Sequence, residues 1–245
     1  MTRARALRSV GPMHHAEVRT FFDGWALYEA ILDHEAMHHT AFFAVATAAL
    51  QRDLGARPLT VLDLGCGSAR HAARLLAGRP VAAYTGYDLS ATALAAAKAN
   101  LAAAGIRADL QAEDLGRGLE GPPDSVDLIL CSYALHHLGT ARKGAALADA
   151  RRRLRAGGRM LLIDMAREDG ETRAVTAEAY ASWVERDWRF LPAAQRADIR
   201  AHIFAHDFPE EDATVTRLAR EAGWAEPALL ARERWHRAWW LRAAG

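Results

Sequence analysis

The stretch from Leu59 to Arg70, LTVLDLGCGSAR, limits the fold of this chain more than any other part of it. An apolar run is cut off by Gly65-Cys66-Gly67, and a helical pattern begins at about Arg70. This order predicts a strand, a tight glycine loop and a helix. Glycine allows positive φ and close approach to the backbone, and the N–H groups that open a helix carry partial positive charge. A polar or anionic group of a ligand is therefore expected at this loop.

Two common nucleotide-binding motifs do not fit the loop. A dinucleotide fingerprint needs a third glycine where Arg70 stands, and a P-loop needs a Gly-Lys-Ser/Thr that is missing here. The string VLDLGCGSAR instead resembles motif I of the class I S-adenosylmethionine (SAM) dependent methyltransferases. The resemblance covers about residues 57–165 through specific motifs and the remainder through topology alone. It implies SAM as cofactor and transfer of a methyl group, by in-line displacement, to a small-molecule acceptor.

Strand and helix patterns alternate from residue 59 to about 170 and end in a pair of strands. They predict a Rossmann-like, doubly wound α/β sheet of seven strands, mostly parallel with one antiparallel strand. The expected strands cover residues 59–64, 81–89, 108–113, 126–131, 159–165, 228–232 and 235–241, and the main helices cover 70–77, 91–104, 140–155 and 209–222. Gly157-Gly158 is expected to stop the third of these helices, and Glu210, Glu211 and Asp212 to form the acidic first turn of the last one.

Two helical segments lie outside this pattern. Residues 1–55 are predicted to be an N-terminal cap, with a helical pattern from about Ala16 that breaks near Gly24 or Asp33, and residues 56–245 to be the SAM-binding domain. Within that domain, residues 170–207 read as a helical lid inserted after the fifth strand, with Pro192 between two helices. We expect the cap and the lid to select the acceptor.

The resemblance also implies which residues hold the cofactor. Asp88 follows the second strand about 20 residues beyond the glycine loop, where a carboxylate can accept two hydrogen bonds from the ribose hydroxyls. After the third strand, Asp114 is preferred over Glu113 for the adenine amino group by analogy of position. Tyr28 and Trp25 could lie against the sulfonium or pack in the core. The full expected set is Tyr28, Asp63, Gly65, Cys66, Gly67, Ser68, Asp88, Leu89, Glu113, Asp114, Leu115, Cys131 and Ser132.

Candidates for catalysis lie in two segments. Tyr133 and His136 follow the fourth strand, in the segment that flanks the reactive methyl in the resembled family. On the cap, His34, His38 and His39 are candidate general bases because imidazole titrates near neutrality, and His38 is preferred. His34 to His38 also match HExxH, the helix of zinc peptidases. No third ligand follows at the characteristic spacing, so no metal is expected.

Composition sets limits on partners and compartment. The formal net charge is +1, and the basic run Arg151 to Arg155 falls at the end of a predicted helix, where cations suit the dipole, so nucleic acid is not expected as a partner. Two cysteines and the lack of a signal-like or membrane-spanning stretch favour the cytoplasm. Trp239 and Trp240 serve packing or an oligomer contact, which leaves a homodimer open. An RNA methyltransferase and a non-catalytic interaction protein with a SAM fold remain alternatives.

Overall fold

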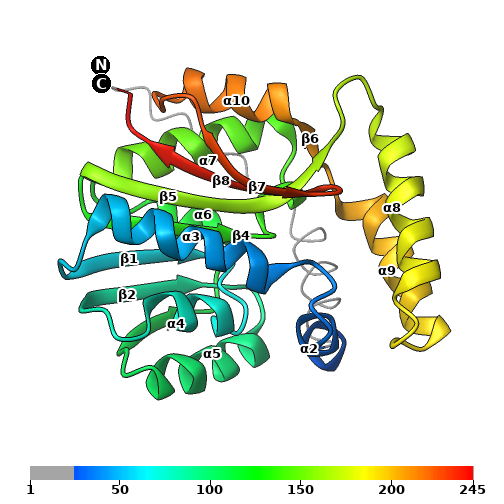
Figure 1. Cartoon of the computed structure of the whole chain (residues 1–245), viewed down its shortest axis with the longest axis horizontal. Coiled ribbons are helices and arrows are strands. Elements are labelled where there is room, and N and C mark those ends of the chain that lie inside the picture. Colours follow the sequence, from blue (N-terminus) through cyan, green and yellow to red (C-terminus); the bar gives the residue numbers. More distant parts are fainter. Residues whose placement is uncertain (1–24, 245) are drawn as a thin grey trace.

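The computed structural model describes the backbone of residues 25–244 and the side chains from residue 27 onward; the predicted helical pattern of residues 16–24 and the side chain of Trp25 lie outside the described part. One sheet runs through the middle of the molecule, with helices on both faces (Figure 1). Its strands lie in the order β3-β2-β1-β4-β5-β8-β7, and a short strand, β6, pairs with β5 off this path.

The sheet is parallel except at β8, which pairs antiparallel with both β5 and β7. This confirms the predicted Rossmann-like sheet and its single antiparallel strand. The strands are β1 (Leu59–Leu64), β2 (Val81–Tyr87), β3 (Ala108–Gln111), β4 (Val126–Ser132), β5 (Leu154–Arg167), β6 (Glu210–Glu211), β7 (Ala228–Glu233) and β8 (His236–Arg242).

Alternate residues of the central strands supply two separate cores, as a period of two requires. In β4, Leu128 and Leu130 join the core on one face of the sheet, while Ile129 and Cys131 join the core on the other. The first face is covered by α3 (His39–Leu54), α4 (Arg70–Leu76) and α5 (Ala91–Ala103), and the second by α6 (Leu115–Leu119), α7 (Thr140–Arg153) and α10 (Asp212–Glu221).

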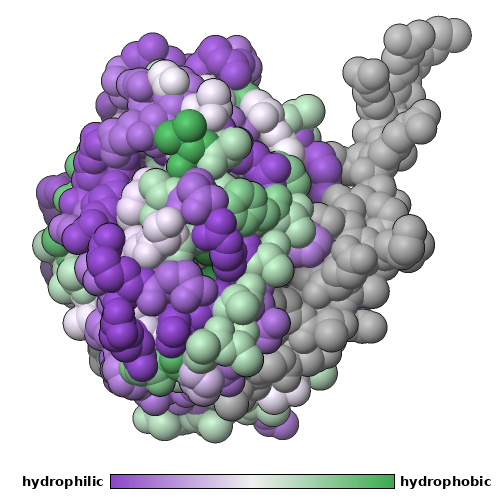
Figure 2. Space-filling model, turned by 90° about the vertical axis from the view of Figure 1, so that its right-hand side faces the viewer, coloured by the Kyte–Doolittle hydropathy of each residue, from purple (hydrophilic) through white to green (hydrophobic). Residues whose placement is uncertain are grey.

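Two further groups of helices lie near the ends of the strands that carry the predicted site (Figure 1). Helix α2 (Trp25–Asp33) precedes α3, and the break between them falls at the predicted Asp33. Helices α8 (Arg173–Asp187) and α9 (Ala193–His206) occupy the segment 170–207 that is predicted to be a helical lid, and we call this pair the lid. Figure 2 views the side of the molecule on which the lid lies, and most of this surface is hydrophilic. Among the described residues, no helix has the length and apolar character that crossing a bilayer demands.

Some predicted boundaries are wrong. The last helix begins at Asp212, because Glu210 and Glu211 form β6. Gly157-Gly158 lies inside β5, which starts at Leu154 and shifts register against β4 there. The short helix α6 was not predicted. Trp239 and Trp240 are both buried within the chain, one in each core, which confirms packing as their role.

Candidate functional site

The glycine loop after β1 has the geometry that its sequence predicts. Gly65 and Gly67 adopt positive φ angles of 68° and 51°, which side-chain-bearing residues rarely adopt. A Cβ on Gly65 would lie 2.5 Å from the Cβ of Ala134, so the loop also passes too close to the segment after β4 for any side chain. The backbone of this loop is therefore exposed to a ligand at the carboxyl ends of β1 and β4.

Asp88 is fixed beside the loop by backbone donors. The N–H of Gly67 donates to its Oδ2 at 2.8 Å, and the N–H of Ser90 donates to its Oδ1 at 2.9 Å. Burial raises the pKa of Asp88 above its ordinary value, although these two N–H groups oppose the shift. Each oxygen keeps a second lone pair, so the carboxylate can still accept bonds from a vicinal diol.

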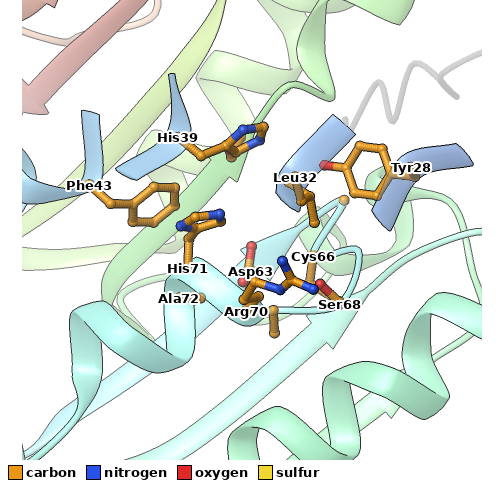
Figure 3. Close-up of a pocket in the computed structure, with 13 residues that line it drawn as sticks. Tyr28, Leu32, His39, Phe43, Asp63, Cys66, Ser68, Arg70, His71 and Ala72 are labelled. Atoms are coloured by element: carbon orange, nitrogen blue, oxygen red, sulfur yellow. The ribbon is translucent and has the colours of Figure 1, made fainter. Parts of the chain in front are cut away.

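A cavity lies between this loop and helices α2 and α3 (Figure 3). We call it the donor cavity. Figure 3 shows Tyr28 and Leu32 reaching in from α2, and His39 and Phe43 from α3, on the side opposite the glycine loop. Its empty volume, open solvent included, is about 370 Å³. The residues that line it are Tyr28, Leu32, His39, Phe43, Asp63, Gly65, Cys66, Ser68, Ala69, Arg70, His71, Ala72 and Ser132.

Several buried polar atoms at the donor cavity have no hydrogen-bond partner among the described residues. They are Oγ of Ser132, both ring nitrogens of His39 and Nε2 of His71. The rings of His39 and His71 stack with their centroids 5.0 Å apart. Unpaired buried polar groups are costly, so this cavity fits a ligand that carries polar groups of its own.

Asp63 occupies the floor of the donor cavity at the end of β1. Burial raises its pKa to about 7; the hydroxyl of Tyr84, which donates to Oδ2, opposes the shift, and the nearby Asp88 carboxylate adds to it. Only 4% of the residue is exposed, so water does little to solvate the charged carboxylate. A cationic group in the cavity would be drawn to this carboxylate.

A second cavity, which we call the acceptor cavity, lies between the end of the sheet and the lid. Its empty volume is about 510 Å³. Tyr28 lines both cavities and so forms a shared wall. The residues that line it are Tyr28, Ile31, Met37, Tyr133, His136, His137, Met165, Tyr180, Trp188, Ile199, His202, Ile203 and Asp207.

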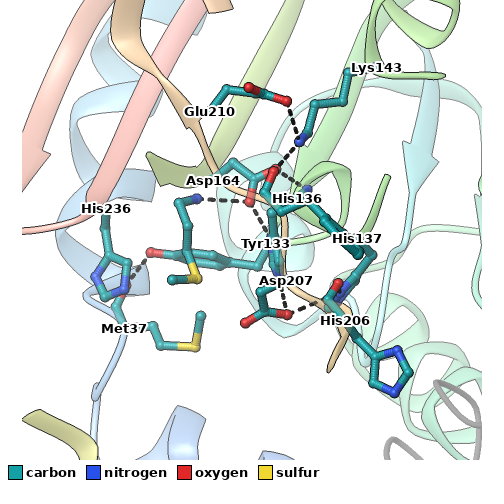
Figure 4. Close-up of polar contacts among 12 residues, drawn as sticks. Met37, Tyr133, His136, His137, Lys143, Asp164, His206, Asp207, Glu210 and His236 are labelled. Carbon is teal, nitrogen blue, oxygen red and sulfur yellow. Dashed lines mark hydrogen bonds and ion pairs between the residues drawn. The ribbon is translucent and has the colours of Figure 1, made fainter. Parts of the chain in front are cut away.

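Tyr133 and His136, both predicted candidates for catalysis, line the acceptor cavity. The Tyr133 hydroxyl donates to the carbonyl of Met37, and burial raises its pKa well above the ordinary value, so it stays protonated. His136 is buried, and Figure 4 shows its ring joined to Asp164. Burial alone would lower the pKa of His136, but the carboxylates of Asp164 and Asp207 raise it above the ordinary value.

The HExxH match does not form the helix on which a zinc peptidase depends. Helix α2 ends at Asp33, and Glu35 and His38 have φ angles of 50° and 58°. Glu35 instead accepts hydrogen bonds from the N–H and hydroxyl of Thr40 at the start of α3. His38, the predicted base, lines neither cavity; its ring lies 5.6 Å from that of His236.

The other predicted cofactor residues follow the same edge of the sheet. Asp88 and Leu89 follow β2, and Gly67 lies in the loop after β1. Cys131 is buried in β4. Past β3, Glu113 is exposed and pairs with Arg117, whereas Asp114 accepts a bond from the N–H of Gly116 and so begins α6, whose first residue is Leu115. None of these residues lines the two cavities.

Sequence reasoning missed several residues that the structure brings to the cavities or beside them. Asp164, next to the acceptor cavity through His136, carried a signal, because it interrupts the apolar run of β5 at the carboxyl edge of the sheet. His71, His202 and Asp207 carried none, because they come from helices and a loop far from the motifs. His39, weighed beside His38 as a cap base, is the one of the two that lines the donor cavity.

The arginine run at the end of α7 serves the fold, as predicted. Arg152 donates to the carbonyls of Gly121 and Leu119 at 2.8 and 2.6 Å, and Arg153 donates to the Ser125 hydroxyl at 3.0 Å. These guanidinium groups hold the chain between α6 and β4. They are therefore engaged within the protein.

A glycine loop after β1, carboxylates after β2 and β3, and a reversed strand between β5 and β7 define the Rossmann-like fold of class I methyltransferases. Solved structures agree. Magnesium protoporphyrin IX methyltransferase from Synechocystis PCC 6803 with bound SAH is 15% identical, with a TM-score of 0.65 over 94% of this chain and 100% of that chain. The methyltransferase SibL in its apo form is 22% identical, with a TM-score of 0.55 over 86% and 58% of the two chains. At these identities the likeness shows the fold.

Sequence comparison assigns the central segment. Residues 61–158 match the family described as "Methyltransferase domain". An uncharacterized methyltransferase of Geobacillus thermodenitrificans is 30% identical over 102 residues, 38% of this chain and 47% of that protein. Release factor glutamine methyltransferase of Cereibacter sphaeroides is 46% identical over 71 residues, 29% and 25% of the two chains. The matched segment thus spans about half the length of the Geobacillus relative and about a quarter of the length of the Cereibacter one. Residues 61–158 thus match a methyltransferase domain, and the fold around them is that of the class I SAM-dependent methyltransferases.

Proposed function

We propose that this protein transfers the methyl group of SAM to a small-molecule acceptor. The observation that carries the proposal is the pair of adjoining cavities, which share Tyr28 as a wall. The donor supplies a methyl carbon activated by a positively charged sulfur, which a lone pair of the acceptor attacks in line as the carbon–sulfur bond breaks. The protein's own contribution is alignment and exclusion of water, which can lower the barrier by several kcal/mol.

The donor would lie along the carboxyl edge of the sheet. Because strands stand about 4.8 Å apart, β1, β2 and β3 offer contacts spread over about 10 Å, enough for an elongated nucleoside. Asp63 and the glycine loop would hold the amino acid end, Asp88 the ribose, and Asp114 the adenine. The unpaired Ser132 hydroxyl and His39 ring supply the polar contacts near the middle of the donor. His39 thus stands where a base was expected from His38.

The acceptor cavity supports a small molecule over RNA. Apolar and aromatic side chains of the lid, among them Tyr180, Trp188 and Ile203, form much of its wall, and no arginine or lysine of the described residues lines it. The arginine run that could bind a phosphate backbone makes internal hydrogen bonds instead. We also propose a cytoplasmic location, since Cys66 and Cys131 are both free and buried.

The first experiment tests the donor. Calorimetry on the full chain should show saturable heat with SAM and with its demethylated product. Incubation with methyl-labelled SAM and either a fraction of small metabolites or total RNA should then place the label in the small-molecule fraction. No heat with either compound would remove the enzymatic proposal, and label in RNA would replace the acceptor class.

A matched pair of variants tests the ribose assignment. Asp88→Ala should weaken SAM binding at least tenfold, about 1.4 kcal/mol, because it removes a charge-assisted acceptor. Glu120→Ala removes an exposed carboxylate that pairs with Arg117 and should leave the affinity unchanged. Wild-type affinity in Asp88→Ala would show that the ribose lies elsewhere.

A further inference from the structure

Three imidazole nitrogens surround one carboxylate oxygen in the wall of the acceptor cavity. Oδ1 of Asp207 lies 3.3 Å from Nδ1 of His137, 3.5 Å from Nε2 of His202 and 3.6 Å from Nε2 of His136. All three distances exceed those of ordinary N–H···O hydrogen bonds, about 2.7–3.2 Å. They match instead the spacing of about 3.3–3.6 Å between atoms that share one tetrahedral ion at about 2.0–2.2 Å.

Two histidines and one carboxylate of this group satisfy the demands of a metal site. His136, His137 and Asp207 each offer a ligand atom, and these atoms all lie within 4.8 Å of one another. This is the set with which proteins bind Zn²⁺ or Fe²⁺ while leaving coordination positions open. His202, whose Nε2 faces the same oxygen, stands beside the three.

The surroundings of His136 orient it as a ligand. Its Nδ1 is bonded to Asp164, which turns Nε2 toward Asp207 (Figure 4). Asp164 is in turn fixed by the N–H groups of His136 and Met165 at 2.9 and 2.8 Å. A ligating histidine commonly donates its other ring N–H to a carboxylate in this way, which sets the tautomer and the ring orientation.

Charge balance points in the same direction. Asp164 and Asp207 are both buried, and the ion-pair partners of the Asp207 side chain among the described residues are all histidines. The nearby buried ammonium of Lys143 is bonded to Glu210 and to a backbone carbonyl. A divalent cation bound among these groups would balance the charge of the buried Asp207 carboxylate.

We propose that His136, His137 and Asp207 bind a divalent transition-metal ion of the Zn²⁺ or Fe²⁺ class in the wall of the acceptor cavity. His136 and His137 follow β4, and Asp207 follows α9, so the ion joins the sheet to the lid. On the proposed function, which this step requires, the open positions select an acceptor that carries an oxygen or nitrogen donor atom. Asp164 is a positioning residue for His136.

Calorimetric titration of ZnCl2 into the full chain tests the site. The protein should carry no affinity tag, should be stripped with a chelator, and should contain no SAM. We expect one ion per chain. Asp207→Asn and His136→Gln should each weaken binding at least tenfold, and Asp164→Asn by about ten- to a hundredfold. His34→Gln, which alters the HExxH match outside the cluster, should bind as wild type. With CoCl2, visible bands should appear without thiolate charge-transfer absorption.

The outcomes separate this proposal from the proposed function. Each variant is first shown to be folded by its heat of binding to the demethylated product, which the donor cavity binds. No zinc binding by wild type, or full affinity in Asp207→Asn, overturns the metal site while leaving methyl transfer in place. Loss of the ion in His34→Gln, or a thiolate spectrum, overturns it by placing the ion elsewhere. Failure of the product to bind wild type, with zinc still bound, overturns only the proposed function.

Discussion

The fold shifts the pKa of Asp63 into the neutral range, where its ionisation can be measured. With a pKa of about 7, its carboxyl is about half protonated at neutral pH in the free protein. The ordinary value is 3.8, and the shift arises mainly from burial. The amino group of the proposed donor is a cation and would stabilise the charged form, so donor binding and proton loss should be coupled.

We therefore expect donor binding to release a proton. Below pH 7 Asp63 is mostly protonated, so binding at pH 6 should release close to one proton, and binding above pH 8 should release almost none. The number of protons is measured by calorimetry in buffers that differ in ionisation enthalpy. Asp63→Asn, which has no proton to lose, should abolish the dependence on the buffer. Equal release by this variant would show that another group is responsible.

A pair of glycine substitutions distinguishes the cost of backbone strain at Gly65 from the cost of a steric clash. Gly65→Ala places a Cβ 2.5 Å from that of Ala134 at a φ of 68°, whereas Gly78→Ala meets no atom within 4 Å at a φ of 72°. Both should lose about 1–2 kcal/mol to the left-handed conformation, and Gly65→Ala about 1–3 kcal/mol more to overpacking. Urea unfolding measures the difference. Equal losses would mean that the loop moves freely away from the segment after β4.

At this scale the sequence predicted the residues that belong to contiguous motifs. The glycine loop and Asp88 follow from spacing along the chain, and their geometry agrees with it. Asp207 could not be found in this way, because only tertiary packing brings the end of α9 to the sheet. His39, which lines the donor cavity, stands one position along the chain from the preferred His38. The αL conformation of His38 determines which of the two rings faces the cavity.

Among the elements, the junction of α7 with the α6 segment distinguishes a structural role from RNA binding. The double variant Arg152→Ala, Arg153→Ala loses hydrogen bonds to Leu119, Gly121 and Ser125. We expect a loss of about 1–3 kcal/mol in the free energy of unfolding, because removing the charged guanidinium donors leaves carbonyls unpaired. Arg107→Ala, at an exposed position, should change little. Retention of RNA on filters should be unchanged, and a steep loss would revive the RNA alternative.

Long elements were predictable and short ones were not. The strands from β1 to β5 and helices α8 and α9 carry apolar periodicity over several residues, and each was expected near its observed place. Helix α6 and strand β6 contain five and two residues, too few to show a period. Helix α6 begins at a local cap, in which the N–H of Gly116 donates to Asp114, whereas β6 exists because β5 pairs with it, which is a tertiary contact.

At the scale of the whole molecule, helix α2 takes part in both cavities. It contributes Tyr28 and Leu32 to the donor cavity and Tyr28 and Ile31 to the acceptor cavity, which the lid helices α8 and α9 complete. Helix α2 is tied to the start of α4 by Arg70, which pairs with Glu29 and with Asp33. Partly exposed ion pairs contribute little to stability, so we expect α2 to open before the sheet unfolds.

Hydrogen exchange should therefore show that the donor orders α2 and leaves the lid alone. At a concentration of the demethylated product a hundred times its Kd, openings that release it cost about 2.7 kcal/mol more, so exchange should slow about a hundredfold. This protection should cover α2, residues 65–69 and residues 132–134. Amides of α8 and of the far strand β7 should exchange at unchanged rates, because neither contacts the donor cavity. Protection of the loop without protection of α2 would mean that the donor enters by another route and that Tyr28 is a fixed wall.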